Sequence, residues 1–169
     1  MNKCSSVVSY VRQLGPQHMP LWRQGIELDL NEFSHPWTEE QWQQTFEVYT
    51  PYFFFHYRPD NSEAGQELLC TALLLMTPGD DLAHLVKIQT KRSVQGLGHA
   101  KKLFSEITQT LARDGLKTIY LEVEESNHPA VQFYHHHQFL VLRRLKDFYG
   151  QSRHALAMAK SLTATQANL

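Results

Sequence analysis

The sequence predicts an α+β fold, with a mixed and mostly antiparallel central sheet flanked by helices. Strand-like and helical runs are mixed along the chain, in an order that favours antiparallel pairs. Residues 97–111 carry apolar side chains at helical spacing, and residues 118–124 alternate apolar and polar side chains as a half-buried strand does. The length of 169 residues predicts a single domain over residues 1–160, followed by a polar tail over 161–169.

The composition excludes several classes of protein. The formal net charge of −1 gives no reason to expect attraction to nucleic acid or to a membrane surface. No apolar run approaches the roughly 20 residues that span a bilayer, and the first residues lack a secretory signal. We therefore expect a cytoplasmic protein in which Cys4 and Cys70 are free thiols rather than a disulfide.

The first half of the chain predicts four strands and two helices. The second helix has the best-defined start, because Thr38 to Gln41 form a capping box and Trp42 and Phe46 follow at helical spacing. Polar residues 58–66 predict a loop, and residues 77–80 predict a turn. The expected strands are 5–11, 52–57, 68–76 and 82–90, and the expected helices are 20–30 and a segment beginning at 38.

The second half begins with the clear amphipathic helix, which Gly115 is expected to end. Its predicted apolar stripe consists of Leu97, Ala100, Leu103, Phe104, Ile107 and Leu111. After the alternating strand, Ser126 and Asn127 followed by Pro129 predict the start of a short helix that runs to about His136. Two last strands are expected over 139–142 and 155–159.

The loop between the fourth strand and this helix is suited to bind phosphate. Gly96 and Gly98 let the backbone approach a ligand, and the helix start offers free amides and a positive dipole end. Basic side chains nearby could add charge: Lys91, Arg92, Lys101 and Lys102. The loop lacks the third glycine of a dinucleotide fingerprint and the Lys-Ser/Thr of a P-loop. By itself it is equally well explained as a structural turn.

With this loop the chain resembles the GNAT acetyltransferase superfamily, whose central motif is a strand, an Arg/Gln-x-x-Gly-x-Gly/Ala loop and a helix. Gly96 and Gly98 match the motif, while Ser93 and Thr90 depart from it. The resemblance spans roughly residues 18–160 and is nearest to the ribosomal-protein-alanine N-acetyltransferase (RimI) type. The further matching positions are Pro36-Trp37-Thr38, Leu121-Glu122-Val123, Ser126-Asn127, Pro129-Ala130, Phe133-Tyr134, Phe139, Arg143-Arg144 and Phe148-Tyr149.

The resemblance implies acetyl-CoA as the co-substrate and no metal. The residues it places at the cofactor are Val86, Lys87, Ile88, Val94, Gln95, Gly96, Leu97, Gly98, His99 and Asn127. Most of these contacts would come from backbone amides, and the Ile88 amide is the candidate donor to the thioester oxygen. Asn127 is explained equally well as a plain helix cap. One departure is the run from His135 to Gln138, where the family usually ends its helix with Leu-Gly.

The resemblance also supplies catalytic candidates. Glu122 would deprotonate the amine, directly or through a water, and Tyr134 would protonate the leaving thiolate. The alternatives are a solvated glutamate on a strand face and a tyrosine that packs a short helix. Trp37 and Tyr149 are expected to wall a peptide groove, although Trp37 is equally suited to pack the second helix.

Two other patterns have simpler explanations. Consecutive histidines, His135 to His137, do not share a helix face, so they predict no metal site. An acidic stretch could attract a basic peptide, but a solvated helix face explains it better. Its members are Glu27, Asp29, Glu32, Glu39 and Glu40.

The expected activity is direct acetyl transfer to a protein N-terminal α-amine, first of all an exposed alanine of a ribosomal protein. An α-amine has a pKa of about 8 and a lysine about 10.4, so neutralising lysine at pH 7 costs about 3 kcal/mol more. A lone glutamate is better matched to the α-amine. The alternatives are a small-molecule amine acetyltransferase and a non-catalytic acyl-CoA-binding regulator. The oligomeric state stays open.

Overall fold

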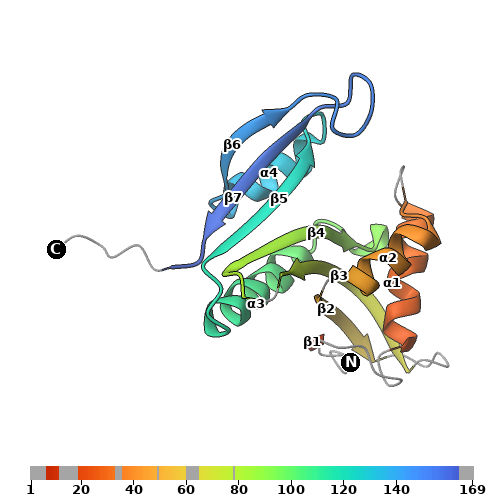
Figure 1. The fold of residues 1–169 in the computed structure, drawn as a ribbon. Coiled ribbons are helices and arrows are strands. Elements are labelled where there is room, and N and C mark those ends of the chain that lie inside the picture. The colour runs from red at the N-terminus through yellow and green to blue at the C-terminus, as the bar shows by residue number, and fades with distance from the viewer. Residues whose placement is uncertain are drawn as a thin grey trace.

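Seven strands form one sheet in the order β1-β2-β3-β4-β5-β7-β6, with helices on both of its faces (Figure 1). The computed structural model describes residues 7–11, 19–32, 36–48, 50–59, 65–77 and 79–163. In chain order the elements are β1 (Val7–Val11), α1 (Met19–Glu32), α2 (Glu39–Val48), β2 (Thr50–Pro59), β3 (Gln66–Met76), β4 (Leu82–Thr90), a 3₁₀ turn (Arg92–Val94), α3 (His99–Arg113), β5 (Thr118–Glu124), α4 (His128–His136), β6 (Leu140–Leu145) and β7 (Ala155–Ser161).

The predicted α+β class and mostly antiparallel sheet are confirmed. Among the described residues, five strand pairs are antiparallel, and only β4 and β5 are parallel. The main differences lie at element ends. β2 and β3 extend into the predicted loop at residues 58–66, and β6 occupies Leu140–Leu145 instead of 139–142. Cys4, residues 60–64 and residues 164–169 lie outside the described residues, so the predictions made there stay untested.

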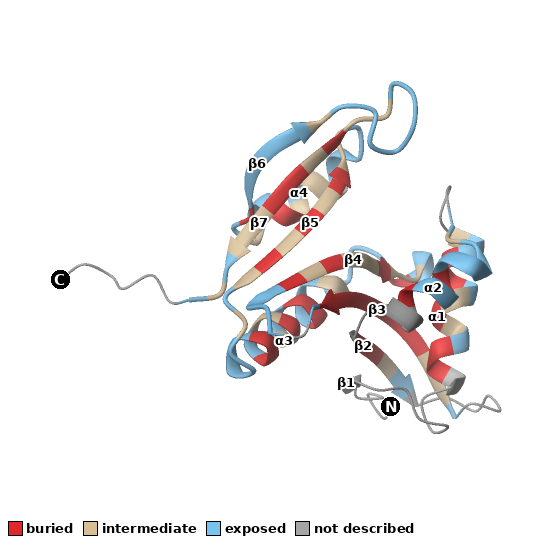
Figure 2. Cartoon of the chain, viewed as in Figure 1, coloured by how far each residue is buried: buried red, intermediate tan, exposed pale blue. Residues whose placement is uncertain are grey.

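Each face of the sheet has its own hydrophobic core, and β2 shows how they are separated. Phe53 and Phe55 belong to the core beneath α1 and α2, whereas Tyr52 and Phe54 belong to the core beneath α3. Successive strand residues point to opposite faces, so an unbroken aromatic run serves both cores. β3 is buried from Leu68 to Met76 for the same reason (Figure 2).

The capping box at the start of α2 is confirmed. The Thr38 amide donates to the Gln41 side-chain oxygen at 2.8 Å, and the Gln41 amide donates to Thr38 Oγ1 at 3.2 Å. Trp42 is buried one turn further on, as its spacing predicts. The Phe46 side chain lies outside the described residues. Of the helices that the structure describes, none has the length and hydropathy needed to cross a bilayer.

The apolar stripe of α3 is confirmed except at its first member. Leu103, Phe104, Ile107 and Leu111 are each at most 1% exposed. Leu97 is 70% exposed, and its assignment to the stripe is wrong because the helix begins only at His99, after Gly98. The apolar spacing extends two residues before the start of the helix, and it therefore assigned a loop residue to the helix face.

The parallel pair β4–β5 is the most unusual part of the sheet. The two strands pair over only three positions: Leu82 with Thr118, Ala83 with Ile119 and His84 with Tyr120. Beyond them the strands diverge, and Figure 1 shows β5, β7 and β6 swinging away from β4 with α4 behind them. The core nevertheless continues along β5, whose Ile119, Leu121 and Val123 are buried as the alternation predicts.

Helix α4 ends at the position where the sequence lacks the family's usual glycine. Gln138 takes that glycine's place and has φ of 66°, in the left-handed region. The turn lets the Phe139 amide donate to the Tyr134 carbonyl at 3.0 Å, and it directs Phe139 into the core. The missing glycine therefore leaves the helix end formed, but in a conformation that disfavours a residue with a Cβ.

Replacing Gln138 with glycine should stabilise the protein by about 1 kcal/mol, since glycine adopts positive φ without strain. Chemical denaturation of Gln138→Gly and the wild type measures the difference. Gln138→Ala is the matched control, because it removes the same amide, which accepts a bond from Lys160, but keeps the strained conformation. A glycine variant no more stable than the alanine variant would show that this turn carries no strain.

Candidate active site

A β-bulge shapes the part of β4 that lies beyond its pairing with β5. Lys87 pairs with Leu73 and Leu85 pairs with Leu74, so Val86 has no partner across the strand pair. A bulge changes which face the following side chains occupy. Leu85 and Ile88 therefore both contact the α3 core, while Val86 packs on the α1–α2 core.

The backbone of β4 presents its unpaired edge toward β5. The Lys91 amide donates to the Leu69 carbonyl of β3 at 2.9 Å. Because the backbone groups of successive residues point to opposite sides of a strand, those of Ile88 and Thr90 point away from β3. The Thr90 carbonyl accepts the Gln95 side-chain amide at 3.0 Å on that side. The Ile88 amide thus faces the gap that the diverging strands leave.

Lys87 directs its side chain away from that gap. Its ammonium lies 2.6 Å from Asp29 of α1, a carboxylate with no exposed surface that also accepts bonds from Gln89 and from the Trp37 amide, each at 2.9 Å. Burial lowers the pKa of Lys87, and the hydrogen bond that Lys87 donates to Asp29 opposes this shift. Only the Lys87 backbone remains for the predicted cofactor contact. The expectation that Asp29 belongs to a solvated acidic face is wrong.

Trp37 packs where the simpler prediction placed it. Its ring lies 4.7 Å from the Trp42 ring and 4.7 Å from the Lys87 ammonium, on the same side of the sheet as α2. This contact agrees with a tryptophan that packs the second helix. Trp37 remains only partly buried, so a further contact with a substrate stays a prediction.

The phosphate-binding loop has the conformation that its glycines predict. Gly96 and Gly98 have φ of 75° and 85°, and a Cβ placed on either would meet no atom within 4 Å. The glycines thus serve the chain conformation and leave open space above the loop. Val94 is buried and anchors the loop, while Gln95 and Leu97 are exposed and His99 opens α3. The first amides of α3 lack intrahelical partners and point toward this open space.

The basic residues near the loop differ in availability. Lys91 is paired with Glu67 at 2.7 Å, and Arg58 pairs with the same carboxylate. The hydrogen bond from Lys91 holds the pKa of Glu67 below its usual value, despite partial burial. Lys91 is therefore engaged by β3, and its predicted contribution to the loop is weakened. Lys101 and Lys102 are exposed on the first turn of α3.

At the other end of the gap, Glu122 lies beside a histidine that the sequence analysis did not identify. Glu122 Oε2 is 2.6 Å from His84 Nε2, with side-chain exposures of 14% and 34%. Burial raises the pKa of Glu122, but hydrogen bonds with His84 and Tyr120 outweigh it and hold the pKa below the usual value. Burial and the neighbouring Glu122 raise the pKa of Tyr120. Glu122 is thus a partly buried carboxylate with two polar partners and not a solvated strand residue.

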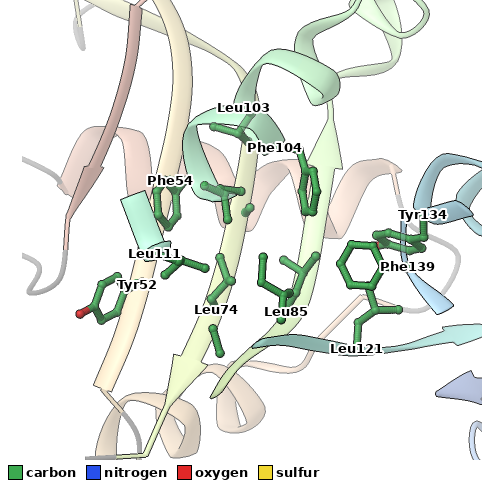
Figure 3. Close-up of a cluster of buried hydrophobic side chains, with 14 of the residues drawn as sticks. Tyr52, Phe54, Leu74, Leu85, Leu103, Phe104, Leu111, Leu121, Tyr134 and Phe139 are labelled. Carbon is green, nitrogen blue, oxygen red and sulfur yellow. The ribbon is translucent and has the colours of Figure 1, made fainter. Parts of the chain in front are cut away.

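Tyr134 is part of the core on the α4 side of β5. Its ring lies 5.6 Å from Phe133 and 5.4 Å from Phe139, and Figure 3 shows it beside Phe139. Burial raises the pKa of the Tyr134 phenol above its usual value, with a further contribution from Tyr149. A phenol of raised pKa stays protonated at neutral pH. The packing role is confirmed, and the role of proton donor stays compatible with it.

Tyr149 lies against β5, in the turn between β6 and β7. Its hydroxyl donates to the Glu122 carbonyl at 3.0 Å, and burial raises its pKa to about 12. Tyr149 therefore borders the predicted catalytic residue, whereas Trp37 lies on the other arm of the sheet. Asn127 caps α4 by accepting the Ala130 amide at 3.3 Å, so its predicted role as a cap is confirmed.

The sequence contains only part of the information needed to identify His84 as a site residue. It lies on the polar side of the Ala83–Leu85 alternation, which a sequence can show. Its partner is 38 residues away, beyond α3, and the register of two parallel strands joined by a helix leaves no local pattern. The sequence could therefore indicate an outward-facing histidine but not its contact with Glu122.

Comparisons with known proteins agree with this geometry. A family model described as the acetyltransferase (GNAT) family matches residues 22–139. The ribosomal-protein-S18-alanine N-acetyltransferase of Escherichia coli is similar in structure, with a TM-score of 0.73 at 20% identity, covering 98% of this chain and 99% of that one. No curated protein matches the sequence.

Two further solved structures are similar. One is NAA60 of Arabidopsis thaliana in complex with a bisubstrate analogue, with a TM-score of 0.71 at 17% identity, covering 93% of this chain and 100% of that one. The other is a chain of the NatC complex bound to Gag peptide and CoA, with a TM-score of 0.73 at 18% identity, covering 92% and 99%. At these identities the likeness shows a shared fold.

Proposed function

Because the chain belongs to the GNAT acetyltransferase family, and is thus an acyltransferase, we propose that it transfers the acetyl group of acetyl-CoA to the N-terminal α-amine of a protein. An exposed alanine of a ribosomal protein is the first acceptor to test, since the solved structures that share this fold include an enzyme named for that substrate. The observation that carries the proposal is the gap between β4 and β5, which has a glycine loop suited to bind phosphate at one end and the Glu122 carboxylate at the other.

The loop and the open strand edge together fit acetyl-CoA. The amides at the start of α3, with the open space above Gly96 and Gly98, suit the pyrophosphate. The edge of β4 from Val86 to Ile88 would bind the extended pantetheine arm through backbone groups. Asn127, which caps the start of α4, would add a contact with the cofactor from the other arm. The remaining loop positions of the cofactor site are Val94, Gln95, Leu97 and His99.

Three groups then act on the reacting atoms. Glu122 supplies the negative charge that draws the proton from the substrate ammonium. The Ile88 amide faces the gap and donates to the thioester oxygen as negative charge develops there. Tyr134 donates its proton to the departing sulfur, since the phenol is protonated at neutral pH and burial raises its pKa further. The amine nitrogen bonds to the acetyl carbon as the carbon–sulfur bond breaks, with no acetyl-enzyme.

The pKa of Glu122 bears on the choice of acceptor. A carboxylate whose pKa lies below its usual value is a weak base. An α-ammonium gives up its proton at a pKa of about 8, and a lysine at about 10.4, so the lysine is about 3 kcal/mol harder to neutralise. The site is therefore better matched to an α-amine. Tyr149, whose hydroxyl donates to the Glu122 carbonyl, would then contact the acceptor.

Acetyl-CoA should stabilise the folded protein. At a concentration of about 100 times its Kd, the expected gain is about 2.7 kcal/mol, measured as a rise in Tm. Gly98→Glu should abolish the rise, because its carboxylate would repel the pyrophosphate. Gly98→Ala is the matched control, since it strains the same positive φ without adding charge. A Tm that acetyl-CoA leaves unchanged in the wild type contradicts the cofactor assignment.

The acceptor preference can be measured by thiol release from acetyl-CoA. Peptides with a free N-terminal alanine or serine should react faster than the same peptides with a blocked N-terminus and an internal lysine, because the α-amine is more easily neutralised. Polyamines and aminoglycosides form the second arm of the comparison. Faster turnover of those small amines would assign a small-molecule acetyltransferase instead.

Glu122→Gln and Tyr134→Phe should respond differently to pH. Each should lose about 10² to 10⁴ in rate at neutral pH. Raising the pH above the pKa of the acceptor amine should restore much of the activity of Glu122→Gln, because the amine then arrives neutral. Tyr134→Phe should show no such recovery, since the thiolate still lacks its donor. Full activity of either variant at neutral pH removes that residue from the mechanism, provided that acetyl-CoA still raises its Tm.

A further inference from the structure

The pair formed by His84 and Glu122 is the least expected feature of the site. The two side chains come from different strands and meet at the last paired position of β4 and β5, where His84 is opposite Tyr120. Their 2.6 Å separation is that of a charge-assisted hydrogen bond. Beyond this position the strands diverge, so the pair borders the end of the gap in which acetyl transfer is proposed to occur.

We infer that His84 is the catalytic residue that accepts the proton of the substrate ammonium. Glu122 acts through His84, because it orients the imidazole and pairs with its protonated form. The inference rests on the proposed function and deepens it. It gives the histidine and the carboxylate different tasks, whereas the sequence supports only a single glutamate base. This division resembles in logic the orientation of a histidine base by a buried carboxylate in hydrolases.

The burial of the two side chains supports this division. Glu122 retains 14% of its side-chain exposure and His84 retains 34%, so the imidazole is the more accessible partner. Nε2 is engaged with the carboxylate, which fixes the N–H at Nε2 and leaves the lone pair on Nδ1. The imidazole can therefore accept a proton from a substrate without first breaking its bond to Glu122.

The neighbours of His84 include one carboxylate and no cation in direct contact, among the described residues. From β5 it faces Glu122 and the ring of Tyr120, whose centroid is 5.3 Å away. Arg143 of β6 interacts with Tyr120, and across β3 the residue opposite His84 is the buried Leu75. The nearest full charge is thus the Glu122 carboxylate, which would pair with the imidazolium once the proton has arrived.

The proton-transfer equilibrium also favours an imidazole over this carboxylate. An imidazole is in general a stronger base than a carboxylate. Hydrogen bonds with His84 and Tyr120 outweigh burial and hold the pKa of Glu122 below its usual value, which makes this carboxylate a weaker base still. Glu122 is then more useful as a permanent negative charge than as the proton acceptor.

The N–H bond of the ammonium breaks, and its proton bonds to Nδ1 of His84, giving a neutral amine and an imidazolium paired with Glu122. The imidazolium, whose side chain is 34% exposed, then returns the proton to solvent. Tyr134 acts separately, on the sulfur, so the two ends of the reaction use different groups.

His84→Gln tests the assignment, because the glutamine amide can still donate to Glu122 from the position of Nε2 but cannot accept a proton. We expect kcat/KM at neutral pH to fall by about 10² to 10⁴. The loss should shrink as the pH rises above the pKa of the acceptor amine. The double variant His84→Gln/Glu122→Gln should be no slower than the slower single variant. His136→Gln, on the exposed face of α4, is the matched control and should leave the rate unchanged.

Wild-type rates from His84→Gln, or losses that multiply in the double variant, would overturn the inference. An unchanged rise of Tm with acetyl-CoA separates a catalytic defect from misfolding. A wild type that acetylates no peptide or amine contradicts the proposed function instead. Imidazole nitrogen NMR shifts, recorded at mildly alkaline pH without any acceptor, show which ring nitrogen of His84 carries the hydrogen. This measurement applies whether or not the protein acetylates an amine. The inference requires the N–H at Nε2, and an N–H at Nδ1 overturns it.

Discussion

The short pairing of β4 with β5 is the constraint on which the rest of this structure depends. Three paired positions join the halves of the sheet, and beyond His84 the two strands separate. An unpaired backbone edge inside a protein needs another partner for its polar groups. The edge of β4 that contains the Ile88 amide is therefore suited to an extended ligand with amide groups of its own. The loop at one end and the Glu122–His84 pair at the other lie on a path that this separation creates.

Contacts from α1 and from the two cores fix β4 where it no longer pairs with β5. Asp29 joins α1 to Lys87 and Gln89 of β4 and to the backbone at Trp37. A buried ion pair of this kind contributes little net stability, but removal of one partner is costly, so it favours one arrangement over others. The bulge at Val86 divides the side chains between the two cores. Together these contacts hold the open edge of β4 in place where β5 no longer pairs with it.

The sequence predicts those features that depend on local patterns. Alternation located β5, helical spacing located α3, and the capping box located α2, because each pattern involves neighbouring residues. The sequence could not predict the contact of His84 with Glu122 or the burial of Asp29, since both depend on the register and packing of distant elements. Leu97 was misplaced because apolar spacing does not mark a helix start. Gln138 adopts the left-handed conformation at the end of α4 although it is not a glycine, the residue that adopts this conformation without strain.

A crystal structure with a bisubstrate analogue, in which CoA is joined to an alanine-terminated peptide, would show directly whether the cofactor occupies the gap between β4 and β5. We expect the pyrophosphate at Gly96 and Gly98 and the pantetheine arm between β4 and β5. We further expect the acetyl oxygen within hydrogen-bond distance of the Ile88 amide, and the peptide nitrogen facing His84 and Glu122. A CoA arm bound outside the gap, or a peptide nitrogen on the far side of the sheet from His84, would contradict this expectation.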